Sequence, residues 1–178
     1  MPEGLIYRDD FVTPEEEHEL LEAIEALDFR ELTMRGQTAR RTVRHFGLEY
    51  GYESGELAAG DPLPEELEWL RERCAALIGR DPADLVQTLV TRYPPGAGIG
   101  WHRDAPTFGS RIAGVSLRAP ARMRLQRTIG GERETASVEL EPRSAYVLSG
   151  KARWSWQHSI PATKDLRYSV TFRTLKRR

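Results

Sequence analysis

The chain has 178 residues, of which 39% are hydrophobic and 30% charged, with a formal net charge of −1. That length fits one domain with a sizeable core, and no run approaches the roughly 20 apolar residues of a membrane span or the pattern of a secretory signal, so we expect a cytoplasmic protein without a membrane partner. Because Cys74 is the single cysteine, an internal disulfide and a cysteine zinc cluster are excluded, and nothing in the sequence indicates an oligomer.

Two helices are predicted in the first half of the chain, after a short strand at residues 5–7. Thr13 is a candidate N-cap and Glu16 stands three residues later, which is the pattern of a capping box. The helix that follows should run to about Leu27, with one apolar stripe packed on a sheet and glutamates on the other side. A second helix is predicted within residues 61–79, where Cys74 is expected to be a buried thiol.

Residues 30–55 mix arginine with aromatic residues and carry few long apolar runs. Such a stretch is not expected to form a central strand of the core. One interpretation is a hairpin whose aromatic side chains cover the sheet.

From residue 86 onward the sequence favours short strands separated by Gly or Pro. The predicted strands are 87–93, 112–117, 123–126, 137–140, 145–148 and 168–173. Two helices followed by many short strands predict a single α+β domain, spanning residues 1–178 and built round a β-sandwich or jelly roll.

His102 and Asp104 form a His-x-Asp motif, and His158 lies far downstream. On a strand, side chains at i and i+2 point to one face, so the first two can hold one edge of a metal ion while the distant histidine completes a triangle. Two histidines and one carboxylate leave open metal positions, as in non-haem Fe(II) oxygenases.

The last predicted strand carries polar residues at alternate positions. Arg167, Ser169, Thr171 and Arg173 would share one face, opposite an apolar face. Buried cations without partners are costly, so these side chains need an occupant, and two arginines can hold a short dicarboxylate between them.

Three segments together, 93–104, 146–158 and 167–173, resemble the AlkB family of Fe(II)- and 2-oxoglutarate-dependent dioxygenases, and the likeness covers about residues 40–173. The resemblance implies a double-stranded β-helix (jelly-roll) core over about residues 86–173 with two supporting N-terminal helices. It implies Fe(II), 2-oxoglutarate and O2 as cofactors. The iron ligands would be His102, Asp104 and His158.

The resemblance also implies co-substrate contacts. Arg167 would bind the distal carboxylate of 2-oxoglutarate and Arg173 the end near the metal, with the Tyr93 hydroxyl as a further donor. Thr91 stands where many relatives carry asparagine, and Ser169 stands where some relatives do. Both residues still form hydrogen bonds, so we expect co-substrate binding with an altered tightness.

Residues 30–55 resemble the family's substrate lid, and aromatic faces stack bases while arginines pair with phosphates. The expected substrate-binding residues are Arg40, Arg41, Arg44, Tyr50, Tyr52 and Trp101. The expected partner is alkylated nucleic acid, single-stranded or with a flipped base. The implied activity is oxidative dealkylation of N-alkylated bases in DNA or RNA, as in DNA repair, with release of formaldehyde from an N-methyl group.

Two alternatives remain. The same chemistry can act on a protein side chain or a small metabolite, since the overall charge is not basic. A catalytically silent binding module can also use this fold, because fold does not fix function. The intact set of candidate ligands and arginines argues against the silent module.

Overall fold

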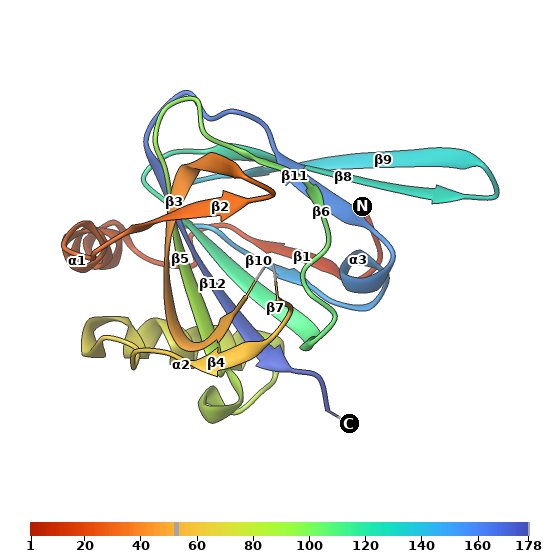
Figure 1. Ribbon diagram of the computed structural model, residues 1–178. Coiled ribbons are helices and arrows are strands. Elements are labelled where there is room, and N and C mark those ends of the chain that lie inside the picture. Colours follow the sequence, from red (N-terminus) through yellow and green to blue (C-terminus); the bar gives the residue numbers. More distant parts are fainter. Residues whose placement is uncertain (52–53, 178) are drawn as a thin grey trace.

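The computed structural model describes residues 1–51 and 54–177. Its strands are β1 Leu5–Arg8, β2 Arg30–Met34, β3 Gln37–Tyr50, β4 Leu57–Ala59, β5 Gln87–Tyr93, β6 Ile99–His102, β7 Phe108–Leu117, β8 Ala121–Ile129, β9 Glu132–Leu140, β10 Ala145–Leu148, β11 Gln157–Ile160 and β12 Arg167–Leu175. An eight-stranded sheet has the order β1-β10-β7-β12-β5-β3-β2, with β4 paired to β3. It faces a four-stranded sheet of order β6-β11-β8-β9 (Figure 1).

Three α-helices accompany the sheets: α1 Pro14–Glu25, α2 Glu68–Ile78 and the short α3 Gly150–Trp154. Single 3-10 turns cover Glu65–Leu67 and Pro82–Asp84. The predicted capping box is confirmed, because the Thr13 hydroxyl accepts from the Glu16 amide at 3.1 Å and the Glu16 carboxylate accepts from the Thr13 amide at 2.9 Å. Across 1–51 and 54–177, none of the helices combines the length and apolar character needed to cross a membrane.

The larger sheet has an apolar outer face and an inner face that mixes polar and apolar residues. Leu20 and Ile24 of α1 and Leu70 of α2 pack in one cluster with Val170 and Phe172 of β12. A second cluster fills part of the space between the sheets, built from Ile112, Met123, Leu125, Leu148, Trp156 and Ile160 among others. Helices α1 and α2 therefore cover one face of the larger sheet, and the opposite face is directed toward the smaller sheet.

The position of β3 corrects one expectation. Residues 37–50 form a strand inside the larger sheet, paired with β5 on one side and with β2 on the other. Phe46 is buried in the cluster under the helices, and Val43 is buried with Leu32 and Leu89 on the inner face. Two well-placed apolar residues therefore anchor a strand whose remaining side chains are mostly polar.

The strands predicted after residue 86 are all observed, with several extended at their ends. The largest extension is in β8 and β9, nine residues each, which continue as a hairpin beyond the body of the molecule (Figure 1). The alternating pattern of the sequence predicted the centres of these strands, whereas their ends depend on pairing with neighbouring strands.

Candidate metal and co-substrate site

The two candidate histidine ligands are cross-strand neighbours. His102 at the end of β6 and His158 in β11 are Cα partners, and their ring centroids lie 4.2 Å apart. Asp104 lies two residues past the end of β6, with its Oδ1 atom 3.9 Å from His102 Nε2 and 3.5 Å from His158 Nε2. The possible ligand atoms of the three residues all lie within 4.8 Å of one another. The fold thus brings together the three residues that the sequence singled out.

Both histidines have the form that a metal requires. His102 Nδ1 lies 2.8 Å from the Gly100 carbonyl oxygen, and because a carbonyl only accepts, Nδ1 must carry the hydrogen and Nε2 keeps its lone pair. Burial, reinforced by the nearby His102, lowers the pKa of His158 to about 4, and burial also lowers the pKa of His102. Two neutral imidazoles at pH 7 follow, and neutral imidazole is the species that ligates metals.

Asp104 is kept ionised by its surroundings. Its side chain is 4% exposed, and burial alone would raise its pKa. The charge of the Arg173 guanidinium outweighs burial and, with smaller contributions from the two histidine rings and the Arg173 hydrogen bond, lowers the pKa of Asp104 below its usual range. Arg173 Nε donates to Oδ2 at 2.6 Å, which leaves Oδ1 directed at the histidines.

The inner face of β12 carries the predicted co-substrate residues. Arg167 is the Cα partner of Tyr93, and Ser169 that of Thr91, so these four lie in adjacent rows across β12 and β5. The guanidinium of Arg167 is buried, lies 5.0 Å from the Tyr93 ring centroid, and donates through Nη2 to Ser116 Oγ at 2.8 Å. Its Nε and Nη1 atoms have no hydrogen-bond partner among the described residues.

Tyr146 on β10 is a site residue that the sequence interpretation missed. It interacts electrostatically with Asp104, Tyr93 and Arg167, and burial, with the Asp104 charge, raises its pKa to about 12. Its ring occupies space left by Gly114 on β7, where a Cβ atom would come within 2.4 Å of the ring. The sequence predicted the strand 145–148 that contains Tyr146. Only the pairing of this strand with β7 shows that the Tyr146 ring faces the site.

His45 on β3 is a second such residue. Its pKa is lowered, mainly by burial, and the charge of Arg173 contributes to the lowering. Since alternate residues of a strand share a face, Arg41 and His45 both lie on the inner side of β3. The correct strand assignment of residues 37–50 would have revealed this.

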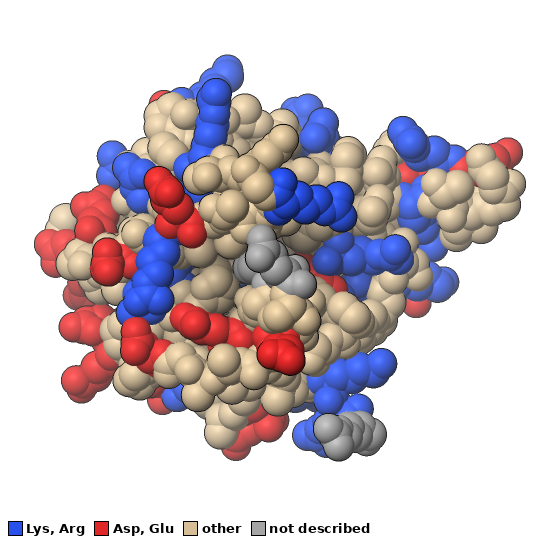
Figure 2. All heavy atoms as spheres, viewed as in Figure 1, with Lys and Arg blue, Asp and Glu red and all other residues tan. Residues whose placement is uncertain are grey.

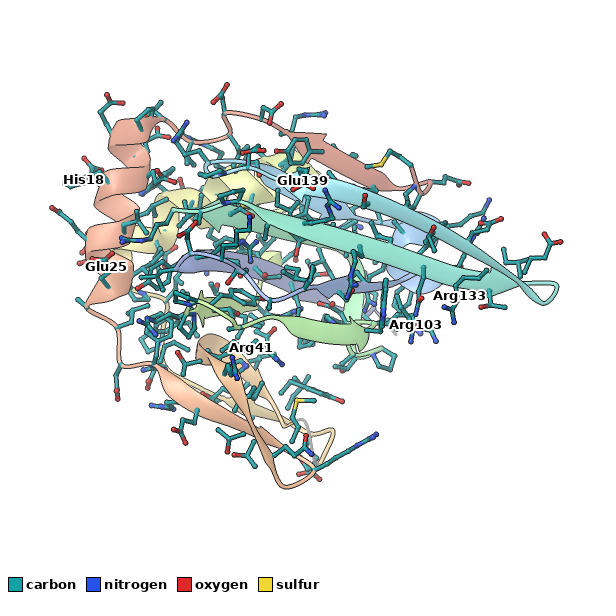
Figure 3. All side chains as sticks on the ribbon, turned by 90° about the horizontal axis from the view of Figure 1, so that it is seen from above. His18, Glu25, Arg41, Arg103, Arg133 and Glu139 are labelled. Carbon is teal, nitrogen blue, oxygen red and sulfur yellow. The ribbon has the colours of Figure 1, made fainter. Side chains whose placement is uncertain are left out.

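Two of the predicted substrate residues reach the site. Arg41 Nη1 donates to the Gly98 carbonyl at 3.3 Å, immediately before β6, and Figure 3 shows Arg41 near the start of that strand. Tyr50 packs against Phe108 with ring centroids 5.8 Å apart, and the Phe108 ring lies 5.2 Å from the Arg173 guanidinium. One cation and one aromatic ring of β3 therefore border the site.

The other predicted substrate residues lie elsewhere. Arg44 forms an ion pair with Asp61 and stacks on Phe46, so its charge is engaged on the outer face of β3. Arg40 is exposed and shares that strand face. Trp101 is 39% exposed and packs under Arg124 of β8. Tyr52 lies outside the described residues.

The residues present fit the cofactors that the sequence indicated. Two neutral imidazoles and one carboxylate are the ligand set of a facial triad, which suits Fe(II) and leaves coordination positions open. The unpaired N–H groups of buried Arg167 fit a carboxylate, which can accept two parallel hydrogen bonds from a guanidinium.

Comparisons with known proteins agree with this geometry. The family model described as the 2OG-Fe(II) oxygenase superfamily matches residues 4–173. The tRNA (carboxymethyluridine(34)-5-O)-methyltransferase alkbh8 of Xenopus tropicalis is 34% identical over 92% of this chain and 26% of its own length. The Alkylated DNA repair protein ALKBH8 homolog of Arabidopsis thaliana is 32% identical over 90% of this chain and 51% of its own length.

The chain therefore spans about a quarter to a half of the length of these two relatives. A solved structure, "The structure of OsALKBH1", superposes with a TM-score of 0.75 over 98% of both chains at 14% identity, which supports the jelly-roll fold. The chain belongs to the 2OG-Fe(II) oxygenase superfamily and, within it, to the AlkB family, whose cofactors are Fe(II), 2-oxoglutarate and O2.

Proposed function

We propose that the chain is an Fe(II)- and 2-oxoglutarate-dependent dioxygenase that oxidatively dealkylates N-alkylated bases in DNA or RNA. The observation that supports the chemistry most directly is the buried Arg167 guanidinium, whose Nε and Nη1 lack a hydrogen-bond partner within the described residues. A buried cation with unpaired donors is costly without a ligand. A carboxylate of 2-oxoglutarate supplies that ligand on the same strand that carries Arg173.

In this proposal His102 Nε2, Asp104 Oδ1 and His158 Nε2 hold the iron. Bound Fe(II), with 2-oxoglutarate and O2, supplies the oxidation of a substrate C–H bond. Arg167 and the Tyr93 hydroxyl bind the distal carboxylate, while Arg173 orients Asp104 and faces the metal end of the co-substrate. The hydroxyl groups of Thr91, Ser169 and Tyr146 complete the polar lining.

The substrate assignment depends on β3 and on the surface charge. Arg41 offers a cation for a phosphate, and Tyr50 a ring on which a base can stack. Figure 2 shows Lys and Arg spread over the upper and right-hand parts of the face, above β2, β3 and the β8–β9 hairpin, whereas most Asp and Glu lie toward α1 and α2. The names of the two relatives, one a tRNA methyltransferase and one an alkylated DNA repair protein, favour nucleic acid over a small metabolite.

The proposed domain organisation is one AlkB-like dioxygenase domain over residues 1–178. Residues 86–173 form its core, and α1 and α2 are its two supporting helices. Residues 30–55 form the substrate lid, although β3 is also an interior strand of the larger sheet. A strand that belongs to both the sheet and the lid can place Arg41 and Tyr50 without a separate lid domain.

Two measurements test the chemistry. Anaerobic addition of Fe(II) and 2-oxoglutarate should produce the visible charge-transfer absorption of the bound pair. In air, oligonucleotides carrying N-methylated bases should then yield formaldehyde and succinate in equal amounts. A wild-type protein that shows no absorption band and no succinate formation would remove the proposal.

Substrate recognition is tested with Tyr50→Ala and Arg41→Ala. Losing one stacking platform, worth roughly 1 to 3 kcal/mol per base, should weaken binding of a methylated single strand by about tenfold or more. The matched control is Arg40→Ala, a neighbouring arginine on the opposite strand face, which should keep most of the affinity. If the wild type binds no nucleic acid even at low salt, where phosphate contacts are strongest, a protein or metabolite substrate replaces this assignment.

A further inference from the structure

Arg153 is a buried arginine on α3 that is not one of the candidate ligands. Its side chain is 2% exposed. Nε donates to the Gly109 carbonyl at 3.0 Å, Nη1 to that of Asp104 at 3.1 Å, and Nη2 to those of Ala105 and Phe108 at 2.9 and 3.2 Å. All of these acceptors lie in one six-residue stretch, 104–109, so a single guanidinium holds the main chain of that stretch.

This stretch needs such support because it begins outside regular structure. β6 ends at His102 and β7 starts at Phe108, so the main chain at Asp104 has no place in a strand ladder. The carboxylate of Asp104 is fixed by Arg173, but its backbone carbonyl is fixed by Arg153. One arginine thus holds the side chain of the candidate ligand, and another holds its main chain.

The same contact connects the two halves of the candidate metal centre. Arg153 lies on α3, and the chain continues from there into β11, which carries His158. In the reverse direction, Arg103 Nη1 donates to the Trp154 carbonyl at 3.3 Å. Figure 3 shows Arg103 just past the end of β6. The segment bearing Asp104 and the segment leading to His158 are therefore linked in both directions.

We propose that Arg153 is a positioning residue of the metal centre, which sets the main-chain position of Asp104 relative to His158 and thereby the affinity for the metal. The inference rests on the metal site of the proposed function. Arginine suits this role because its planar fork addresses several carbonyls at fixed angles, whereas lysine offers three donors from one point. Residues that orient metal ligands commonly change metal affinity by 10- to 100-fold when they are replaced.

The test uses Co(II) alone as the probe, added to metal-free Arg153→Ala and Arg153→Lys proteins, with the dissociation constant and the visible d–d spectrum as readouts. We expect Arg153→Ala to bind Co(II) at least about tenfold more weakly with an altered spectrum. Millimolar guanidinium should partly restore both the affinity and the spectrum. Arg153→Lys, which keeps the charge, covers the case in which the alanine variant does not fold, and it should also bind more weakly.

Arg111→Ala is the matched control. Arg111 also connects two elements through a backbone carbonyl, that of Ile78 in α2, and within the described residues it does not hydrogen-bond to the 104–109 stretch. The Arg111→Ala substitution should lower the melting temperature and leave the Co(II) affinity unchanged. Wild-type Co(II) affinity and spectrum in a folded Arg153→Lys protein would overturn the inference. Absence of Co(II) binding by the wild type would instead overturn the metal site itself, so the two failures are distinguishable.

Discussion

The inner face of β12 carries an arginine at each end, and the two arginines differ in how completely their donors are paired. Arg173 donates to Asp104 at 2.6 Å and to Gln87 at 2.9 Å, both supplied by the protein. Arg167 is more deeply buried and donates to Ser116, with two further nitrogens unpaired within the described chain. Arg173 is therefore fully engaged with neighbouring side chains, whereas Arg167 keeps two donor nitrogens that the 2-oxoglutarate of the proposed function would occupy.

The comparison teaches how a polar strand can lie inside a β-sandwich. A buried ion pair is stable only when its geometry and hydrogen bonds compensate for lost hydration, which the Arg173–Asp104 pair satisfies. An arginine with unpaired donors costs stability in the free protein, and that cost is recovered when a carboxylate binds. The unpaired donors of Arg167 thus indicate the position on β12 at which a bound carboxylate would gain binding free energy.

The largest effect is expected for Asp104→Ala, which removes a candidate metal ligand and the partner of Arg173 together. Turnover of 2-oxoglutarate should be abolished, because two histidines alone cannot complete the triad. Succinate formation and the anaerobic charge-transfer band are the measurements, with circular dichroism as the check on folding. Metal-dependent turnover persisting in this variant would contradict the assignment.

Arg173→Met should cause the next largest change, and mainly in stability. Leaving Asp104 buried and unpaired should lower the free energy of unfolding by about 3 to 5 kcal/mol in the metal-free protein. Urea denaturation of the metal-free protein measures this. Arg173→Met with Asp104→Asn should recover much of the loss, since the uncompensated charge is then gone. If Arg173→Met alone is as stable as the wild type, the Arg173–Asp104 ion pair does not stabilise the metal-free protein.

Arg167→Met should have little effect on stability and a large effect on the 2-oxoglutarate requirement. The unfolding free energy of the apoprotein should change little or increase, because an incompletely paired cation is replaced by an apolar chain of similar length. The 2-oxoglutarate concentration for half-maximal activity should rise roughly 10- to 100-fold, since hydrogen bonds to charged groups are worth about 1.5 to 3 kcal/mol. Equal losses of stability in the Arg167 and Arg173 variants would abolish the distinction between the two ends.

Arg73→Met removes a partly exposed ion pair, for comparison with the buried Arg173–Asp104 pair, and should have the smallest effect on the free energy of unfolding. Arg73 bonds Glu16 at 2.7 and 3.0 Å, but both side chains are partly exposed, so the loss should be about 1 kcal/mol or less. The hydrogen bond from Arg73 lowers the pKa of Glu16. The stabilisation is therefore present above the unfolded pKa of about 4.3 and disappears as pH falls through the lower folded value. The difference between variant and wild type should shrink near pH 3, and a constant difference would argue against the ion pair as its source.

Local patterns in the sequence determined the helix start at Thr13, the strand centres after residue 86 and the polar face of β12. Each depends on spacing along the chain, since capping requires a residue three positions away and strand alternation has a period of two. The grouping of His102 and Asp104 with His158 was likewise identified from residue type and order, because two histidines and one carboxylate are the ligands of the non-haem Fe(II) facial triad.

Only the tertiary structure decided what each polar residue contacts. The sequence did not show that β3 lies between β5 and β2, so it could not separate Arg41, on the inner face, from Arg44, which pairs with Asp61. Nor did it show that Asp104 lies past the end of β6, that Arg153 donates to its backbone carbonyl, or that Gly114 makes room for Tyr146. These contacts join residues between 17 and 69 positions apart, or across strands whose order in the sheet is not their order in the chain, and so no local periodicity encodes them.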